Sequence, residues 1–452
     1  MTFIDQAAAT LQNELPALDW ITDPLRVARL SQDFSWFSPV LKRQLEGRRG
    51  DIAVRPRTEE EIRQVVSRCA RTNTPITLRG TGTGNYGQST PLHGGVIMDM
   101  TGYNGFSWVH GAVGRAQAGI RLADFDTQAR LGGHELRWLP STFRSATLGG
   151  LFGGGFGGVG SINYGPLAAP GNVLGARVMS VEREPQVVEL RGVEAMHLHH
   201  TYGTNGIVLE LEVALAPAMP WMECIATFAD FDDALDFASR FSRAPGMVKK
   251  EVCFLAAPIA DYMAAIAEFL PKGCHAVLLL LAPQSEDAMR DMVAAHGGQI
   301  TYRKTFEEVR SGNRTLVEFT WNHTTLNALK IDKSLTYIQS GFNPARCLDQ
   351  VKALEQALGG EVMMHLEFLR TKEGEFNCSG LQLIRYTTES RLNEIMAIYR
   401  QHGVQINNPH VYVVEDGKQN NIDPKVLQTK QRFDPQGLLN PGKLRVWEQL
   451  KK

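Results

Sequence analysis

Two glycine-rich segments, about sixty residues apart, constrain this chain more than any other feature. The first covers residues 79–87, and the second begins at Ser141 and stays rich in glycine as far as Gly160. Glycine adopts positive φ angles and lets backbone N–H groups approach a ligand closely, so such loops can align donors against phosphate oxygens. Two segments of this kind predict a large phosphate-bearing ligand that is held from both sides.

The first segment also contains a literal dinucleotide-binding pattern. Residues 82–87 read G-x-G-x-x-G and follow an expected strand at residues 75–78. A Rossmann unit would then need a helix and a crossover of a dozen or more residues before the next parallel strand. Instead, Pro91 and Gly95 interrupt the chain and an apolar run begins at residues 96–100. No helix fits there, and this context argues against a Rossmann site.

The second segment has a flexible linker as its alternative interpretation, because eight of the twelve residues from 149 to 160 are glycine. A linker is expected to carry Ser or Pro between its glycines. Here the intervening residues are Leu151, Phe152, Phe156 and Val159, which favour burial. We therefore expect an ordered loop that packs against a core.

The composition is typical of a soluble enzyme. With 452 residues and 43% hydrophobic content, the chain can bury a large core and is expected to form more than one domain. A net charge of −1 gives no electrostatic footprint for nucleic acid or an anionic membrane. The start of the chain lacks a signal-peptide pattern, and the most apolar stretch, residues 275–283, is too short to span a bilayer. Six cysteines without a C-x-x-C pair predict reduced thiols, and we expect a cytoplasmic protein.

The order of elements predicts three sections. Thr58 and Glu61 form a capping pattern for a helix. Short strands and glycine turns then alternate as far as Pro217, after which longer helices alternate with strands. The region 222–304 fits the order β-α-β-β-α-β, which is typical of a ferredoxin-like unit.

The region 334–414 repeats this order, so a duplicated α+β cap is expected. Its last strand has two alternatives, residues 404–406 or 411–414. The other elements are expected at the strand 335–338, the helix 345–358, the strands 362–369 and 381–386, and the helix 389–402.

Several motifs in order give the chain a family resemblance. They lie at residues 54–62, 79–84, 146–150, 163–165, 203–207 and 433–443. On these residues the chain resembles the FAD-binding domain of the vanillyl-alcohol oxidase/p-cresol methylhydroxylase superfamily. Within that superfamily it is most similar to the branch of the glycolate oxidase flavin subunit and the D-lactate dehydrogenases.

The resemblance implies an α+β fold class, with a two-part FAD-binding domain of the p-cresol methylhydroxylase type and a cap of two ferredoxin-like halves. The expected domains are 1–217 for FAD binding, 218–417 for the substrate cap, and 418–452 for a C-terminal return to the FAD domain.

The same resemblance implies the residues that bind FAD. The first loop would wrap the pyrophosphate, the second segment would form the opposite wall, and Ile207 would meet the adenine through its backbone. The branch usually has Thr-Asn at positions 154 and 155, so backbone N–H groups or water must replace those side chains. The implied set is Arg79, Gly80, Thr81, Gly82, Thr83, Gly84, Asn85, Ser141, Ser145, Ala146, Thr147, Gly149, Gly150, Gly154, Gly155, Ser161, Gly206, Ile207 and Asn440.

The flavin is expected to be bound non-covalently. Family members that attach FAD through the first loop have His where this chain has Thr83, and Thr cannot form that bond. A second covalent group uses Cys in the later loop, but no Cys lies between Cys69 and Cys224. Attachment through His323 is the alternative.

The histidines at residues 197–200 invite a metal hypothesis. Their spacing is neither H-x-x-x-H nor supported by a Cys or Glu cluster, so a solvated or core role is favoured and no metal is predicted. The branch often carries a His-x-Gly-Asp-Gly-Asn signature near its active site, which residues 364–367 do not match. A glycolate or D-lactate substrate is therefore not assigned.

The expected reaction follows from the cofactor: a dehydrogenase or oxidase that moves hydride from a CH–OH group, with a 2-hydroxy acid as one candidate, to flavin N5. His323 is the candidate catalytic base, and a hydrogen-bonded interdomain histidine is its alternative role. Arg314, Lys333 or Arg370 would hold a substrate carboxylate.

Two other functions stay open: a catalytically silent FAD-binding subunit, and a small-domain flavin reductase of the cell-wall sugar-nucleotide type. The expected partners are a small-molecule substrate, an unidentified electron acceptor and, as one option, a second copy of the chain. No nucleic acid and no integral membrane segment are expected.

Overall fold

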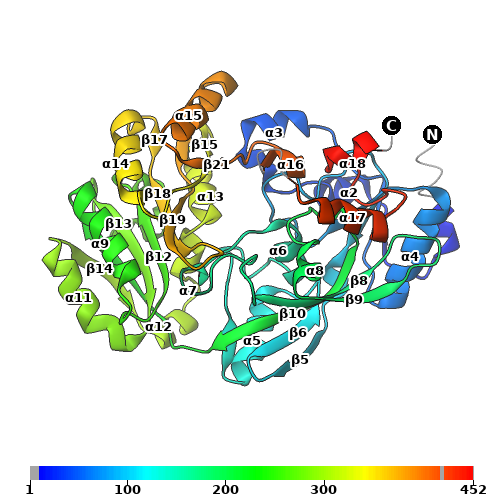
Figure 1. Ribbon diagram of the computed structural model, residues 1–452, viewed down its shortest axis with the longest axis horizontal. Coiled ribbons are helices and arrows are strands. Elements are labelled where there is room, and N and C mark those ends of the chain that lie inside the picture. Colours follow the sequence, from blue (N-terminus) through cyan, green and yellow to red (C-terminus); the bar gives the residue numbers. More distant parts are fainter. Residues whose placement is uncertain (1–9, 418–421, 451–452) are drawn as a thin grey trace.

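The structure is a computed structural model that describes residues 10–417 and 422–450. Two lobes lie side by side in Figure 1. One contains the N-terminal elements and the C-terminal helices, and the other contains the middle of the chain. Within the described residues, no helix is both long and apolar enough to cross a membrane.

A four-stranded sheet forms the first part of the N-terminal lobe. Thr58 caps the helix that packs on this sheet, since its Oγ1 accepts from the Glu61 N–H at 3.2 Å. This cap confirms the predicted helix start. The strand order is β1 (Trp20–Ile21), β2 (Ile52–Val54), β4 (Val96–Asp99) and β3 (Ile76–Arg79), and the helices are α2 (Pro24–Leu30), α3 (Pro39–Gln44) and α4 (Glu59–Thr72).

The connection from β3 to β4 carries the first glycine-rich segment. The two strands pair in parallel, with Ile76 opposite Val96. Parallel strands are usually joined through a helix, but residues 80–95 form an irregular loop in this structure. The predicted absence of a crossover helix is confirmed, and the loop itself provides the crossover.

A second, antiparallel sheet completes the lobe and supports the second glycine-rich segment. Its central strand, β10 (Ile207–Pro217), pairs with three other strands of the sheet. The other strands are β5 (Phe106–His110), β6 (Val113–Gln117), β7 (His134–Leu136), β8 (Val173–Met179) and β9 (Val187–Arg191). The associated helices are α5 (Leu122–Leu131), α6 (Leu148–Gly154), α7 (Ser161–Tyr164) and α8 (Val193–Met196).

The other lobe is built on one eight-stranded sheet with two ferredoxin-like halves. Its order is β14-β11-β13-β12-β18-β19-β16-β21, so both halves show the same 4-1-3-2 arrangement, and they meet through their second strands β12 and β18. The first half contains β11 (Met222–Phe228), α9 (Phe231–Arg243), β12 (Lys249–Leu255), β13 (His275–Leu281), α11 (Glu286–Ala295) and β14 (Gln299–Lys304).

The second half departs from its prediction, because the expected strand 362–369 is broken into β17 of a small sheet and β18 of the large sheet. The expected strands 335–338 and 381–386 match β15 and β20 of the small sheet, whereas β16 and β19 of the large sheet lie outside the predicted ranges. The last strand is β21, so the alternative at residues 411–414 is wrong, and Val414 begins a helix instead. The elements are β15 (Leu335–Tyr337), β16 (Gln339–Gly341), α14 (Cys347–Leu358), β17 (Val362–Met363), β18 (His365–Arg370), β19 (Phe376–Gly380), β20 (Leu383–Arg385), α15 (Glu389–Gln401) and β21 (Gln405–Asn407).

The C-terminal segment returns to the N-terminal lobe, where its helices lie near the blue elements in Figure 1. Leu439 forms a parallel bridge with Ile76 at the edge of the first sheet. Lys430 and Asp434 form a buried ion pair at 2.5 Å. Other α-helices in the described part of the chain are α10 (Ala257–Ala260), α12 (Phe306–Ser311), α13 (Asn322–Ile331), α16 (Val414–Gly417), α17 (Pro424–Phe433) and α18 (Arg445–Leu450).

Candidate cofactor site

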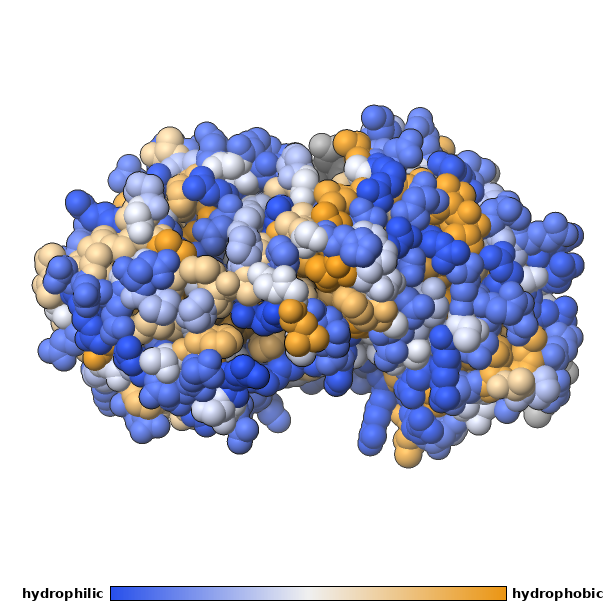
Figure 2. Space-filling model, turned by 90° about the horizontal axis from the view of Figure 1, so that it is seen from below, coloured by the Kyte–Doolittle hydropathy of each residue, from blue (hydrophilic) through white to orange (hydrophobic). Residues whose placement is uncertain are grey.

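A cavity of about 470 Å³ lies where the two glycine-rich segments meet the cap lobe. Figure 2 shows hydrophobic side chains gathered near the middle of the molecule, where the lobes join. Most of the residues predicted to hold the cofactor line this cavity. They are Arg79, Gly80, Thr81, Gly82, Thr83, Gly84, Asn85, Ser141, Ala146, Thr147, Gly149, Gly150, Gly154, Gly155 and Gly206.

Four predicted residues are not among the lining residues. The Ser145 hydroxyl donates to the Thr142 carbonyl, Ser161 Oγ accepts from the Gly158 N–H, and Ile207 is a fully buried residue of β10. Asn440 supports the cavity wall from outside the lining. Its Nδ2 donates to the backbone oxygens of Gln88 and Tyr202 at 2.7 and 2.8 Å. Those two residues line the cavity.

The first glycine-rich segment folds around the buried guanidinium of Arg79. That group donates to the carbonyl oxygens of Leu30 at 2.8 Å, Gln32 at 2.6 Å and Thr81 at 3.2 Å. Gly82 has φ +71° and lies against the guanidinium, so a side chain there would collide with Arg79. Arg79 therefore shapes the loop, and its pKa is lowered by burial.

The same loop presents unused hydrogen-bond donors. The backbone N–H groups of residues 81–85 have no acceptor among the described residues, and the buried Thr81 Oγ1 has no partner there either. Residues 81–85 all line the cavity. Consecutive unpaired amides in a loop of this kind are typical of a site for an anionic group such as a pyrophosphate.

The second segment supplies a close-packed wall. Thr147 Oγ1 accepts from the Gly150 N–H at 3.2 Å, and a Cβ added to Gly149 would lie 2.7 Å from Ala118 Cβ. A Cβ on Gly153 would meet nothing nearer than Gly203 N at 4.0 Å, so this glycine leaves open space on the cavity side. Gln88 Nε2 donates to the Gly154 carbonyl at 2.6 Å and joins the two glycine-rich segments.

Two histidines line the cavity, a role that the sequence does not predict. The spacing of residues 197–200 favours a solvated or core position, but His199 and His200 both contribute to the cavity wall. The His200 and Tyr202 N–H groups donate to the carbonyls of Phe152 and Gly153, which holds this turn on the second segment. His200 and Tyr202 have φ angles of 54° and 56°. Only the positions of the three imidazoles were visible in sequence, because the turn depends on these tertiary contacts.

The cap lobe closes the opposite side of the cavity with uncharged polar groups. Its connections to the first segment are direct: Asn85 Nδ2 donates to Tyr337 Oη at 2.6 Å, and Tyr86 Oη donates to Gln339 Oε1 at 2.6 Å. The cap residues on the wall are Trp321, Asn322, Gln339, Ser340, Ser379, Gly380, Leu381, Asn407 and Asn408.

The three residues predicted to be catalytic are not among the lining residues. His323 follows two that are, and burial lowers its pKa. Arg314 donates to the Ala265 carbonyl on an exposed surface. Arg370 lies 4.2 Å from the Phe376 ring centroid and donates to the Gly374 carbonyl at 2.8 Å, so the β18–β19 hairpin holds its guanidinium. The roles assigned to these residues stay predictions.

Comparison with known proteins agrees with this geometry. Residues 50–184 match the model of the FAD binding domain family. Two uncharacterized FAD-linked oxidoreductases of Mycobacterium tuberculosis are 29% identical over 195 residues, which cover 40% of this chain and 41% of those relatives. The chain thus spans about two fifths of their length. The glycolate oxidase subunit GlcD of Bacillus subtilis is 24% identical over 87% of this chain and 88% of its own.

A solved structure of alkyldihydroxyacetonephosphate synthase shares the fold, with a TM-score of 0.70 at 17% identity over 96% of this chain and 85% of that one. The unpaired amides and the orphaned Thr81 hydroxyl show that the residues present fit an FAD pyrophosphate. Together these findings identify an FAD-binding domain at residues 50–184, and the similarity to FAD-linked oxidoreductases agrees with the resemblance to the vanillyl-alcohol oxidase/p-cresol methylhydroxylase superfamily.

Proposed function

We propose that this protein is an FAD-dependent dehydrogenase or oxidase that takes hydride from the CH–OH carbon of a small molecule, with a 2-hydroxy acid as one candidate. One observation carries the proposal: a single cavity is walled by the FAD-binding loops on one side and by polar cap residues on the other. A molecule bound beside the flavin would therefore contact side chains from both lobes. FAD, when bound, supplies the hydride acceptor.

The chain's own residues have separate tasks in this proposal. The amides of residues 81–85 bind the pyrophosphate, and the second segment excludes water from the opposite face. On the cap side, Asn322 Oδ1 is buried and has no partner among the described residues. A buried acceptor of this kind suits a substrate hydroxyl, which would donate to it.

Proton removal needs an imidazole that is neutral near pH 7. Burial lowers the pKa of His323, which keeps the ring neutral and able to accept a proton. His199 and His200 are the imidazoles that line the cavity. We propose His323 as the base, and the alternative is that His200 is the base. Comparison of His323→Ala with the matched variant His200→Ala separates these two assignments. If His323 is the base, its replacement by Ala slows flavin reduction about 100-fold or more and leaves FAD bound.

The alternative function is a catalytically silent FAD-binding subunit. Two relatives are named as subunits of a glycolate oxidase, which supports this alternative. An anaerobic screen with small alcohols, polyols and 2-hydroxy acids separates the two. We expect at least one CH–OH compound to bleach the visible flavin band. A flavin that dithionite reduces fully but that no compound of the panel bleaches would contradict the proposal.

The flavin is proposed to be non-covalent, because Thr83 stands where a histidine would form the bond. Acid precipitation should leave FAD in the supernatant and a colourless pellet. Colour that stays in the pellet would overturn this part of the proposal and would make His323 the first residue to examine for attachment.

A further inference from the structure

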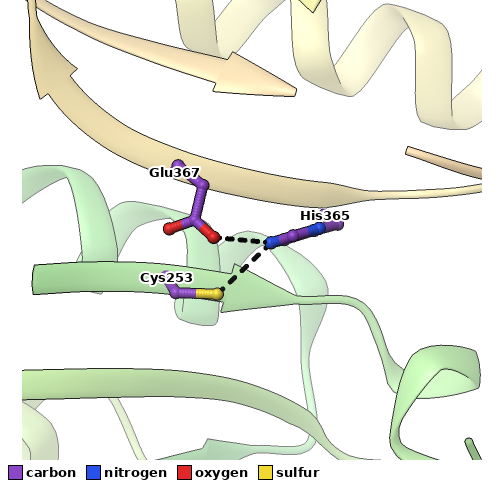
Figure 3. Close-up of side chains that lie close together, drawn as sticks. All are labelled: Cys253, His365 and Glu367. Carbon is purple, nitrogen blue, oxygen red and sulfur yellow. Dashed lines mark hydrogen bonds and ion pairs between the residues drawn. The ribbon is translucent and has the colours of Figure 1, made fainter. Parts of the chain in front are cut away.

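A buried cluster of titratable side chains lies where the two halves of the cap sheet meet. Cys253 on β12 is the register partner of Glu367 on β18, and His365 lies two residues before Glu367. His365 Nε2 is 2.8 Å from Glu367 Oε1 and 3.5 Å from Cys253 Sγ, as Figure 3 shows. The side chains of His365 and Glu367 are fully buried, and the nearby Glu251 is only 2% exposed.

The hydrogen bonds of His365 indicate which atoms of the cluster carry hydrogen. Its Nδ1 is 3.2 Å from the Leu381 carbonyl, which can only accept, so Nδ1 carries the hydrogen. Burial lowers the pKa of His365 to about 3, so the ring is neutral and Nε2 is an acceptor. The carboxyl of Glu367 therefore donates to Nε2, in agreement with the rise that burial causes in its pKa.

Glu251 adds a second carboxyl group to the cluster. Burial, and then repulsion from Glu367, raise the pKa of Glu251 well above its usual value. Two buried carboxyl groups that repel each other retain a proton. The pair is thereby suited to act as hydrogen-bonding anchors inside the sheet, because the retained proton limits their mutual repulsion.

Both carboxyl groups bind the same residue, Trp321. The Trp321 backbone N–H donates to Glu367 Oε1 at 2.5 Å, and the indole Nε1–H donates to Glu251 Oε2 at 3.3 Å. The backbone of Trp321 has φ 50° and ψ −139°, a conformation that is unfavourable for a tryptophan and needs support from its surroundings. The two glutamates provide that support from inside the cap.

The other side of Trp321 meets the FAD-binding lobe. Trp321 lines the cavity, and a Cβ built on Gly157 would lie 3.6 Å from the Cη2 atom of its ring. The indole thus bridges the buried cluster of the cap and the second glycine-rich segment. A shift of either glutamate would move the wall of the cavity.

We propose that Glu251 and Glu367 are positioning residues that fix the indole of Trp321 as a wall of the FAD site. The proposal rests on FAD binding in this cavity but on no particular substrate or reaction. Its readout is flavin fluorescence, because a tryptophan held near an isoalloxazine ring quenches its emission. Loss of an anchor should release the indole and raise the emission.

The experiment compares holoprotein variants with bound FAD. Glu251→Leu removes the acceptor for the indole N–H and should raise flavin emission, whereas Glu251→Gln keeps an acceptor oxygen and should restore the wild-type value. Glu223→Leu is the matched control. Glu223 is also a buried carboxyl of the cap sheet, but it binds Thr315 and Tyr302 rather than Trp321. This control should leave flavin emission unchanged.

Trp321→Phe tests the coupling and keeps the proposal falsifiable if Glu251→Leu is poorly stable. Trp321→Phe alone should raise emission, and Glu251→Leu or Glu251→Gln should add nothing in that background. An equal rise with and without Trp321 would show a general structural effect and overturn the proposal. Unchanged emission in Trp321→Phe, or a stoichiometric metal ion bound by Cys253, His365 and Glu367, would also overturn it.

Discussion

The side-chain amide of Asn85 donates to the hydroxyl oxygen of Tyr337 at 2.6 Å, and both residues are buried. Asn85 ends the run of unpaired amides in the first glycine-rich segment, and Tyr337 belongs to the cap. This bond therefore ties the expected pyrophosphate loop to the lobe that would receive the substrate, across 252 positions of sequence.

Tyr337→Phe removes this bond and leaves the buried amide of Asn85 without its acceptor. We expect a loss of about 1–2 kcal/mol in the free energy of unfolding. Urea unfolding of the FAD-loaded protein measures it. Tyr399→Phe is the control, because the equally buried Tyr399 hydroxyl has no partner among the described residues. Equal losses in the two variants would contradict the importance of the Asn85–Tyr337 bond.

Gly82→Ala should abolish or strongly reduce FAD binding. The added Cβ would collide with the Arg79 guanidinium around which the loop folds. Gly133→Ala separates this effect from backbone strain, since Gly133 has a similar φ of +74° but nothing within 4 Å of an added Cβ. The ratio of flavin to protein absorbance is the measurement. A yellow Gly82→Ala protein with a full complement of FAD would count against the loop geometry.

Asn440→Ala should weaken FAD binding even though Asn440 does not line the cavity. Its amide holds the backbone of Gln88 and Tyr202, so its loss loosens two segments of the wall. Asn327→Ala also removes a hydrogen bond from a side-chain amide to a carbonyl, that of Glu318 in the cap, and should leave the Kd for FAD unchanged. Titration of the apoprotein with FAD compares them, and equal Kd values for both variants would exclude the proposed wall contact.

Stability should fall as the pH drops from about 6.5 to about 4, in part through His410. Burial lowers the pKa of His410 to about 4, and its Nδ1 contacts Ser38 Oγ at 2.8 Å. In this window the unfolded chain binds a proton that the folded chain excludes, so the free energy of unfolding decreases. The loss approaches about 3 kcal/mol below the folded pKa.

Urea midpoints at several pH values test this dependence. His410→Gln should flatten the curve, while His110→Gln, at an exposed position, should leave it unchanged. Parallel curves for the wild type and His410→Gln would show that His410 does not contribute. A residual slope in His410→Gln is expected, because burial also lowers the pKa of His365.

The sequence predicted the elements that local patterns determine. The capped helix at Thr58 and the β-α-β-β-α-β order of elements in both cap halves follow from hydrophobic periodicity and helix caps. The break at Met364 between β17 and β18 was missed, because it depends on pairing with two different sheets. Similarly, Trp321 and Asn322 reach the cavity but His323 does not line it. Trp321 is held from behind by Glu367 and Glu251, and local sequence patterns do not reveal such tertiary contacts.

Hydrogen exchange with and without FAD tests the central claim most directly, namely that one cavity built by both lobes holds the cofactor. FAD should protect the amides of residues 81–85, which have no acceptor among the described residues. Protection should also appear at the cap wall around Trp321 and at residues 379–381. The solvent-facing hairpin around Gly111 serves as the internal reference. Unchanged exchange at residues 81–85 on FAD binding would contradict the account.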